Sequence, residues 1–160
     1  MRSGEQCGDI GADLFKRPLK LSVLPDEILR EKCEPVTIFS SRLEAFMQEM
    51  LSSMKKWGGI GLAAPQVGVS LRAVVLEVGG SVLLLANPEI VGFRKEFICA
   101  EEGCLSIPDR SYRVNRSRFV EVRARTASGG RLHFEAEEFF ARVLQHEIDH
   151  LDGVLICDKC

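Results

Sequence analysis

Two histidines and a glutamate near the end of the chain form the pattern with the clearest chemical meaning. His146 and His150 stand four residues apart in the stretch QHEIDHLDG, residues 145–153, with Glu147 between them. On a helix, residues four apart lie on the same face, so both imidazoles can bind one metal ion. A carboxylate beside such an ion can take a proton from water and pass it to a leaving group. The stretch therefore predicts a hydrolytic metal site on a helix.

The same pattern also fits two histidines that bind no metal, either exposed or buried in a core. This alternative is disfavoured because the surrounding residues are heavily apolar, which predicts a central and buried helix. These apolar residues are Phe139, Phe140, Val143, Leu144, Ile148 and Leu151.

A hydrolytic metal ion usually has three protein ligands, so a third ligand must be found. Downstream, the protease pattern H-x-x-G-x-x-H would require a histidine where Ile156 stands, and the ten residues after His150 include no glutamate. Upstream, Cys104 lies in EGCLS, residues 102–106, and its thiolate would be a strong ligand. A single cysteine is more often a structural thiol. Its neighbours favour a ligand, and we expect Cys104 in a loop before Pro108.

A first helix is predicted from about Ser40 to Gly58, because apolar residues recur there with helical spacing along one face. Ser41 followed by Glu44 predicts a capping box at the start, and Gly58-Gly59 predicts the end. The face that should pack into the core consists of Leu43, Phe46, Met47, Met50, Leu51 and Met54.

Two hairpins are predicted between the helices. Residues 72–78 and 81–86 are apolar or β-branched and flank Gly79-Gly80, and residues 119–126 and 131–137 flank Ser128-Gly129-Gly130. The last helix should begin near Glu137 and Glu138 and stop at Gly153. This order predicts an α+β fold, with mostly antiparallel sheets packed around a central C-terminal helix that carries the metal site.

Composition indicates one globular domain of 160 residues with 46% hydrophobic residues. The net charge is −2 and the 21 basic residues are scattered, which predicts neither DNA binding nor membrane binding. Six arginines between positions 110 and 125 are expected on exposed faces. With no signal peptide and no apolar run of the ~20 residues that span a bilayer, we expect a soluble intracellular protein with reduced cysteines. Residues 1–18 are interpreted as a flexible extension and 19–160 as the catalytic domain.

Three stretches together resemble the peptide deformylase family: GIGLAAPQ at 59–66, EGCLS at 102–106 and QHEIDHLDG at 145–153. The similarity extends over roughly residues 20–156. It implies removal of the formyl group from the initiator methionine of new polypeptides, with release of formate. It also implies that Cys104, His146 and His150 are the metal ligands, with water as the fourth ligand, and that Glu147 is the acid and base.

The resemblance further implies roles in binding the reacting group and the substrate. The Gln66 side-chain amide and the Leu105 backbone N–H would stabilise the oxyanion. Gly59, Ile60 and Gly61 would lie beside the substrate backbone, which pairs with this segment as an added strand. Val143, one turn before His146, would form a wall of the pocket for the methionine side chain.

Members of the family commonly use ferrous iron, so Fe²⁺ is the expected ion, with Zn²⁺, Co²⁺ or Ni²⁺ as alternatives. The expected partners are N-formylmethionyl peptides emerging from the ribosome, in a bacterial-type cytoplasm or an organelle. Behind the site, Glu102, Arg116 and Asp149 are expected to form an ion-pair network.

Two other functions stay open at this point. A metallopeptidase that cleaves internal peptide bonds is disfavoured by Cys104 and by the missing downstream ligand. A non-catalytic metal-binding module is disfavoured by Glu147 and Gln66, because neither is needed to hold an ion.

Overall fold

The structure, a computed structural model, describes residues 18–160, so the predicted extension over 1–18 lies outside the described residues except for its last position. The elements in chain order are η2 (Glu27–Arg30), α1 (Ser41–Lys56), β1 (Gly61–Ala63), η3 (Ala64–Val67), β2 (Ala73–Val78), β3 (Ser81–Phe93), β4 (Phe97–Cys104), β5 (Ile107–Ser117), β6 (Phe119–Arg125), β7 (Arg131–Glu137), α2 (Glu138–Leu151) and η4 (Ile156–Asp158).

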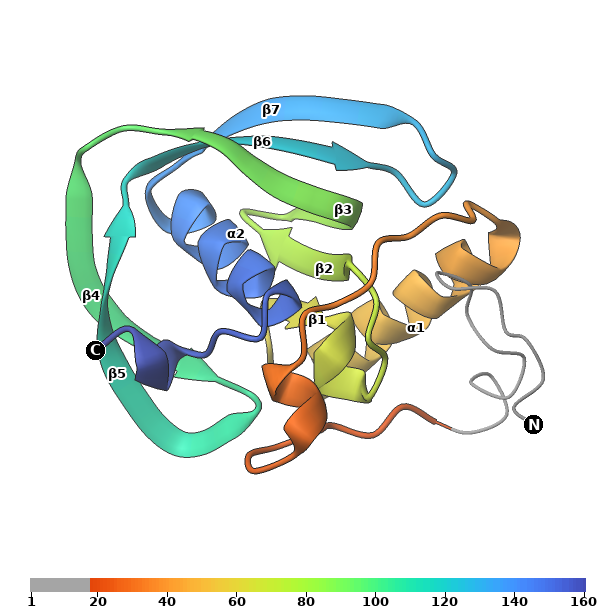
Figure 1. Ribbon diagram of the computed structural model, residues 1–160, viewed down its shortest axis with the longest axis horizontal. Coiled ribbons are helices and arrows are strands. Elements are labelled where there is room, and N and C mark those ends of the chain that lie inside the picture. Colours follow the sequence, from red (N-terminus) through yellow and green to blue (C-terminus); the bar gives the residue numbers. More distant parts are fainter. Residues whose placement is uncertain (1–17) are drawn as a thin grey trace.

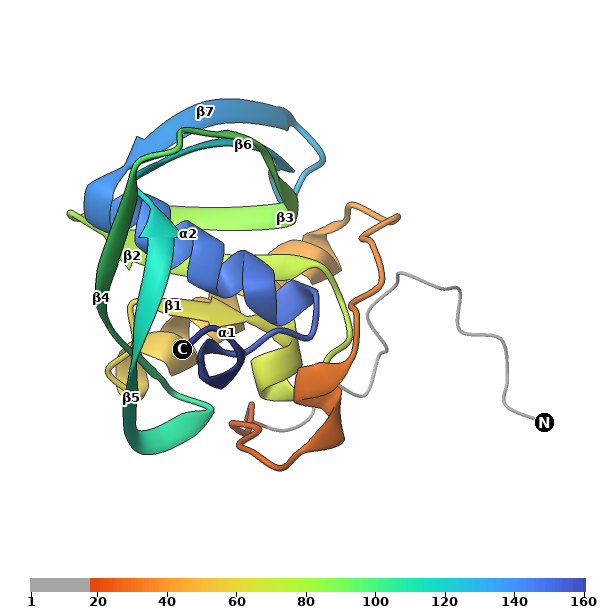
Figure 2. The same ribbon diagram turned by 60° about the vertical axis from the view of Figure 1, so that its left-hand side comes forward.

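The predicted α+β class is confirmed. One sheet has five strands in the order β1-β2-β3-β6-β7, and β4 and β5 form a separate two-stranded sheet. All pairs between these strands are antiparallel. Figure 1 shows α2 enclosed between the five-stranded sheet and the β4–β5 hairpin, with α1 beside β1 and β2. The turned view in Figure 2 shows β4 and β5 crossing one side of α2.

Strand β2 separates two hydrophobic cores. Its side chains alternate, as strand geometry requires, so that Ala73 and Val75 pack with α1 while Val74 and Leu76 pack with α2. All four are fully buried. The metal-site helix is thus held against the buried face of a sheet that α1 covers from the other side.

Helix α1 begins one residue earlier than the capping box predicted. Ser40, not Ser41, is the N-cap, and its side chain accepts a hydrogen bond from the Leu43 N–H. Ser40 has an extended backbone, with φ −142° and ψ 166°, which allows its hydroxyl to reach an unpaired N–H of the first turn. The helix ends as predicted, with Trp57 as C-cap and Gly58 at φ +72°.

Both predicted hairpins are present. Gly79 and Gly80 have φ values of +60° and +81°, which the tight turn between β2 and β3 requires. Strand β3 continues well past its predicted end at position 86 and carries a register shift between Ala86 and Glu89. Asn87 lies at this irregularity with φ +50°, and its side chain is tied to the backbone N–H and C=O of Val36.

The β4–β5 hairpin was not predicted, and the expectation of a loop at Cys104 is wrong. Cys104 is the last residue of β4, at a register shift where it pairs with Ile107. The inward face of this hairpin includes the buried charges of Glu102 and Arg116. Because buried positions hold ionic residues, the apolar and polar alternation that identifies a strand is lost.

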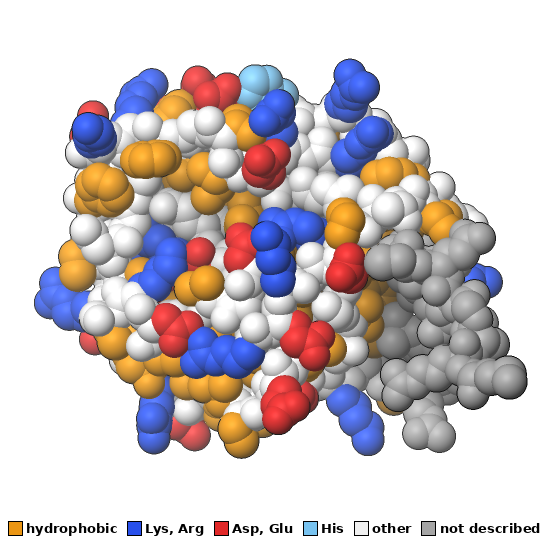
Figure 3. Space-filling model, in the orientation of Figure 1, with side chains coloured by type: hydrophobic (Ala, Val, Ile, Leu, Met, Phe, Trp, Pro, Cys, Tyr) orange, Lys and Arg blue, Asp and Glu red, His pale blue; other side chains and the backbone are white. Residues whose placement is uncertain are grey.

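No helix among residues 18–160 combines the length and the apolar character that a membrane crossing requires. The cysteines in this range are free thiols. On the face drawn in Figure 3, cationic and anionic side chains are interspersed.

Candidate metal centre and active site

Three side chains from two elements converge beside the buried side of α2. Cys104 comes from the end of β4, and His146 and His150 lie one turn apart on α2. One ligand atom from each lies within 4.8 Å of the other two. The Cys104 Sγ is 3.3 Å from His150 Nε2, and the two imidazole rings meet edge to face with centroids 5.0 Å apart. The three predicted ligands therefore form one cluster.

The protonation of His150 suits a metal ligand. Burial, followed by the charges of His146 and Arg116, holds the pKa of His150 well below its usual range, so the ring is neutral. Its Nδ1 has no hydrogen-bond partner among the described residues. With the proton on Nδ1, the Nε2 lone pair beside Cys104 is free to bind an ion. One thiolate and two imidazoles match the donor set of a divalent transition metal.

The other imidazole is oriented by a carboxylate. His146 Nδ1 lies 3.0 Å from Glu102 Oε2, which directs Nε2 toward the ligand cluster. Burial lowers the pKa of His146, but hydrogen bonds with Cys104 and Glu102 outweigh it and raise the pKa to about 10. A proton therefore competes with a metal ion for Nε2 of His146.

The ion-pair network expected behind the site is present. Arg116 donates to both oxygens of Glu102 at 2.9 Å, and its third nitrogen pairs with Asp149. Burial raises the pKa of Glu102, yet hydrogen bonds from His146 and Arg116 hold it well below the usual range. The expectation that all six clustered arginines lie on exposed faces is wrong for Arg116, which is 3% exposed. Sequence reasoning also missed a fourth member, Arg142, which donates to Glu102.

Glu147 is buried and lies beside β1. Burial raises the pKa of Glu147 to about 7, against the lowering effects of His146 and Arg116. Its Oε2 has no hydrogen-bond partner among the described residues. A carboxyl group that titrates near neutral pH can both accept and donate a proton, which is the behaviour required of an acid and base.

Gln66 has a defined amide orientation. Its Oε1 accepts a hydrogen bond from the Ala63 N–H at 2.9 Å. This leaves Nε2 to donate to Ser106 Oγ at 3.1 Å and toward Cys104 Sγ at 3.7 Å. The side-chain donor of Gln66 is therefore held next to the ligand cluster, and Leu105, in the turn between β4 and β5, lines the same cavity.

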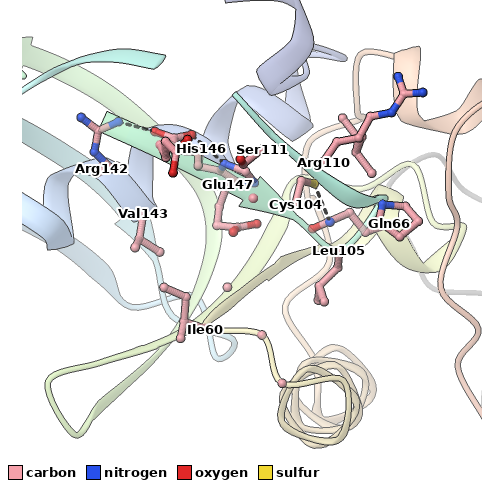
Figure 4. A pocket seen from close by; sticks show the side chains of 18 of the residues that line it. Ile60, Gln66, Cys104, Leu105, Arg110, Ser111, Arg142, Val143, His146 and Glu147 are labelled. Atoms are coloured by element: carbon pink, nitrogen blue, oxygen red, sulfur yellow. Dashed lines mark hydrogen bonds and ion pairs between the residues drawn. The ribbon is translucent and has the colours of Figure 1, made fainter. Parts of the chain in front are cut away.

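A cavity of about 660 Å³ opens beside the cluster and is lined by every residue that was predicted to contact the substrate. Gly59, Ile60, Gly61 and Val143 all line this cavity. Figure 4 shows the side chains of Ile60 and Val143 among those that line it. Two further lining residues, Phe139 and Arg142, were not predicted to line the site, although both lie on α2 one turn before a predicted site residue.

Strand β1 is an edge strand of the sheet, and its residue Gly61 lines the cavity. Within residues 18–160, β1 pairs only with β2. An unpaired strand edge exposes backbone N–H and C=O groups that can bind an extended peptide. The arrangement is compatible with the added-strand interaction expected at Gly59 and Gly61.

The comparisons with known proteins agree with the geometry. The family model for polypeptide deformylase matches residues 18–160. A peptide deformylase from Thermotoga petrophila is 42% identical over 140 residues, covering 88% of this chain and 85% of the relative. Another, from Heliobacterium modesticaldum, is 46% identical over 134 residues, covering 84% and 88%.

Solved structures are similar over the same region. The peptide deformylase from Thermotoga maritima has a TM-score of 0.88 at 40% identity and covers 89% of this chain and 97% of that one. The peptide deformylase from Legionella pneumophila has a TM-score of 0.86 at 39% identity and covers 90% and 86%. The chain therefore belongs to the polypeptide deformylase family, the metalloenzymes that remove the formyl group from the amino terminus of new polypeptides.

Proposed function

We propose that this chain hydrolyses the N-formyl group of methionine at the amino terminus of polypeptides emerging from the ribosome. Water adds to the formyl carbon and the C–N bond breaks, which gives formate and a free amine. The observation that carries the proposal is the cluster of Cys104, His146 and His150 next to a buried Glu147 and a cavity that ends at the free edge of β1.

Cys104, His146 and His150 would hold one divalent ion. When bound, such an ion lowers the pKa of a water molecule and polarises the formyl carbonyl as a Lewis acid. One thiolate and two imidazoles suit several metals, and we propose Fe²⁺ first, with Zn²⁺, Co²⁺ or Ni²⁺ as alternatives. A thiolate-ligated ferrous enzyme would lose activity in air as the thiolate and the iron oxidise.

Glu147 would move the proton. Its carboxylate accepts a proton from the attacking water and then delivers it to the amine nitrogen as the C–N bond breaks. A pKa raised to about 7 by burial fits both steps at neutral pH, because neither protonation state is strongly disfavoured.

Gln66 and Leu105 would stabilise the charge that develops on the formyl oxygen. Support comes from the Ala63 N–H, which fixes the Gln66 carbonyl and so turns its amide donor toward Cys104. The backbone N–H of Leu105, the next residue after Cys104, would be the second donor. A donor that is fixed before the reaction need not reorganise when the charge appears.

The substrate would bind as an extended strand. Gly59, Ile60 and Gly61 would pair with its backbone along the edge of β1, and the methionine side chain would enter the cavity between Ile60 and Val143. The reaction would take place where formylated chains are made, in a bacterial-type cytoplasm or an organelle, and needs no contact with DNA.

A metallopeptidase and a non-catalytic metal-binding module are the alternatives. No contact among the described residues favours either. The third side chain of the cluster is a cysteine from β4, and the site also holds an acid/base candidate and an amide donor that simple metal storage does not need.

The test is release of formate from formyl-Met-Ala-Ser by protein purified anaerobically with Fe²⁺. Wild type should release formate, and Glu147→Ala should not while retaining its metal. Glu135→Ala removes an exposed glutamate of β7 and is the matched control, which should keep the wild-type rate. Metal-loaded wild type that releases no formate would contradict the proposal, and cleavage of internal peptide bonds would favour the metallopeptidase.

A further inference from the structure

Arg142 makes a set of buried contacts that the proposed reaction does not use. Its side chain is 11% exposed. One terminal nitrogen donates to Glu102 Oε1 at 2.6 Å and to the Val114 carbonyl at 3.0 Å. The other terminal nitrogen donates to the Ile98 carbonyl. Because Ile98 lies on β4 and Val114 on β5, this one guanidinium ties α2 to both strands of the hairpin.

With His146 neutral, as a metal ligand must be, the charge balance behind the metal site depends on Arg142. Glu102 and Asp149 are two carboxylates, and Arg116 between them supplies only one positive charge. Arg142 adds the second buried guanidinium, while Lys159 reaches Asp149 at 3.0 Å with a side chain that is 36% exposed to solvent. Solvent screens the lysine, whereas a buried carboxylate without its cation carries a large desolvation penalty.

The hydrogen bonds to Glu102 come from two elements, β5 and α2. Each carboxylate oxygen takes one bond from Arg116, at 2.9 Å. Each also takes one contact from α2: Oε1 from Arg142, and Oε2 from His146 Nδ1 at 3.0 Å. Arg142 and His146 are four residues apart and share a helix face. Each oxygen of the carboxylate is thus held by one partner from β5 and one from α2.

This geometry decides where the His146 ring points. If Oε1 lost its partner from the helix, the carboxylate could turn about its bonds to Arg116, and Oε2 would move relative to Nδ1. The lone pair on Nε2 would then move out of the ligand cluster. We infer that Arg142 is a positioning residue for the metal site, which acts through Glu102 to aim His146. The inference rests on the proposed function, since it assigns His146 as a metal ligand.

The test compares Arg142→Met and Arg142→Lys with wild type. Methionine keeps an unbranched stem in the cavity wall and removes the guanidinium, and lysine keeps the charge but cannot serve Glu102 and both carbonyls at once. Arg118→Met is the matched control, because Arg118 is half exposed and pairs with Glu138 at the start of the same helix. The probe is Co²⁺, measured by competition with a chelator and by the visible ligand-field spectrum, with thermal unfolding as the check on folding.

We expect Arg142→Met to fold and to bind Co²⁺ about tenfold to a hundredfold more weakly, with a shifted spectrum. Arg142→Lys should recover part of the affinity, and Arg118→Met should bind within about twofold of wild type. Wild-type affinity and spectrum in Arg142→Met would overturn the inference. If that variant does not fold, Arg142→Lys decides, and an unchanged spectrum and affinity there would overturn it.

The readout also separates this inference from the proposed function. Co²⁺ affinity and spectrum do not require turnover. Wild type that binds Co²⁺ with a thiolate signature but releases no formate would refute the function alone. Wild type that releases formate while Arg142→Met and Arg142→Lys bind Co²⁺ normally would refute the inference alone.

Discussion

Gly61 of β1 lies directly against the carboxylate of Glu147 on α2. A Cβ at Gly61 would overlap the Glu147 Oε1 and contact the rest of the carboxyl group closer than atoms approach in proteins. Gly61 has an ordinary backbone conformation, so the need for glycine here comes from the neighbouring side chain. The position of the proposed acid and base is therefore set by the absence of a side chain on the adjacent strand.

Gly61→Ala should lower kcat for formyl-Met-Ala-Ser by about a hundredfold, because a displacement of about 1 Å at a reacting group has that cost. The metal ligands are not displaced, so metal content should stay at the wild-type value. Kinetics and metal analysis of the same sample check both statements. A variant with wild-type kcat would show that the carboxylate tolerates the shift.

Gln66→Ala should lower kcat by roughly 10²–10³, the cost of losing one oxyanion donor. The ion should still bind, because the Gln66 amide lies 3.7 Å from the Cys104 sulfur and is not one of the three clustered ligands. Gln66→Glu replaces the donor with an acceptor and should be at least as slow. An unchanged kcat in both variants would remove Gln66 from the reaction.

Removal of the metal with a chelator should abolish formate release and lower the melting temperature, and added Fe²⁺ or Co²⁺ should restore both. An ion present at 100 times its dissociation constant stabilises the fold by about 2.7 kcal/mol. Since His146, with its pKa raised to about 10, must lose a proton to bind metal, affinity should weaken as pH falls. Calorimetry of both proteins checks the assignment of the metal ligands: the melting temperature of wild type should respond to metal, and that of Cys104→Ala should not.

Gly153→Ala should destabilise the protein by more than about 1 kcal/mol. Gly153 follows α2 with φ +70°, and a Cβ there would collide with the Arg30 carbonyl oxygen. The left-handed backbone and this collision both disfavour any residue other than glycine at position 153. Urea unfolding gives the change, and Ser128→Ala, in the exposed turn before β7, is the control that should change little. Equal midpoints for Gly153→Ala and wild type would contradict the strain at this position.

The predictions from sequence succeeded where local rules determine the structure. Runs of apolar or β-branched residues and the Gly79-Gly80 pair were enough to place the first hairpin, and helical spacing placed the two histidines on one face. Cys104 was proposed as the third ligand from its neighbours, and the full set of three was implied by the resemblance to peptide deformylases. The location of Cys104 on a strand was not predicted. The β4–β5 hairpin turns buried charges inward, and pattern rules assign charged residues to the surface.

The role of Arg142 was missed for a related reason. An arginine on a helix is normally exposed, and only the tertiary structure brings it to Glu102, which is 40 residues away in sequence. The Glu102–Arg116 pair was expected from the family resemblance and because three charges are unlikely to be buried unpaired. No comparable sequence pattern indicated the fourth charge, Arg142.

In the proposed binding mode, the short edge strand β1 has a consequence for which polypeptides can be processed. The hydrogen bonds along a strand edge are made by main-chain groups, and every polypeptide carries the same main chain. Hydrogen bonds of this kind do not distinguish one polypeptide from another. An enzyme that binds its substrate in this way can therefore act on many different new polypeptides, whatever each message encodes.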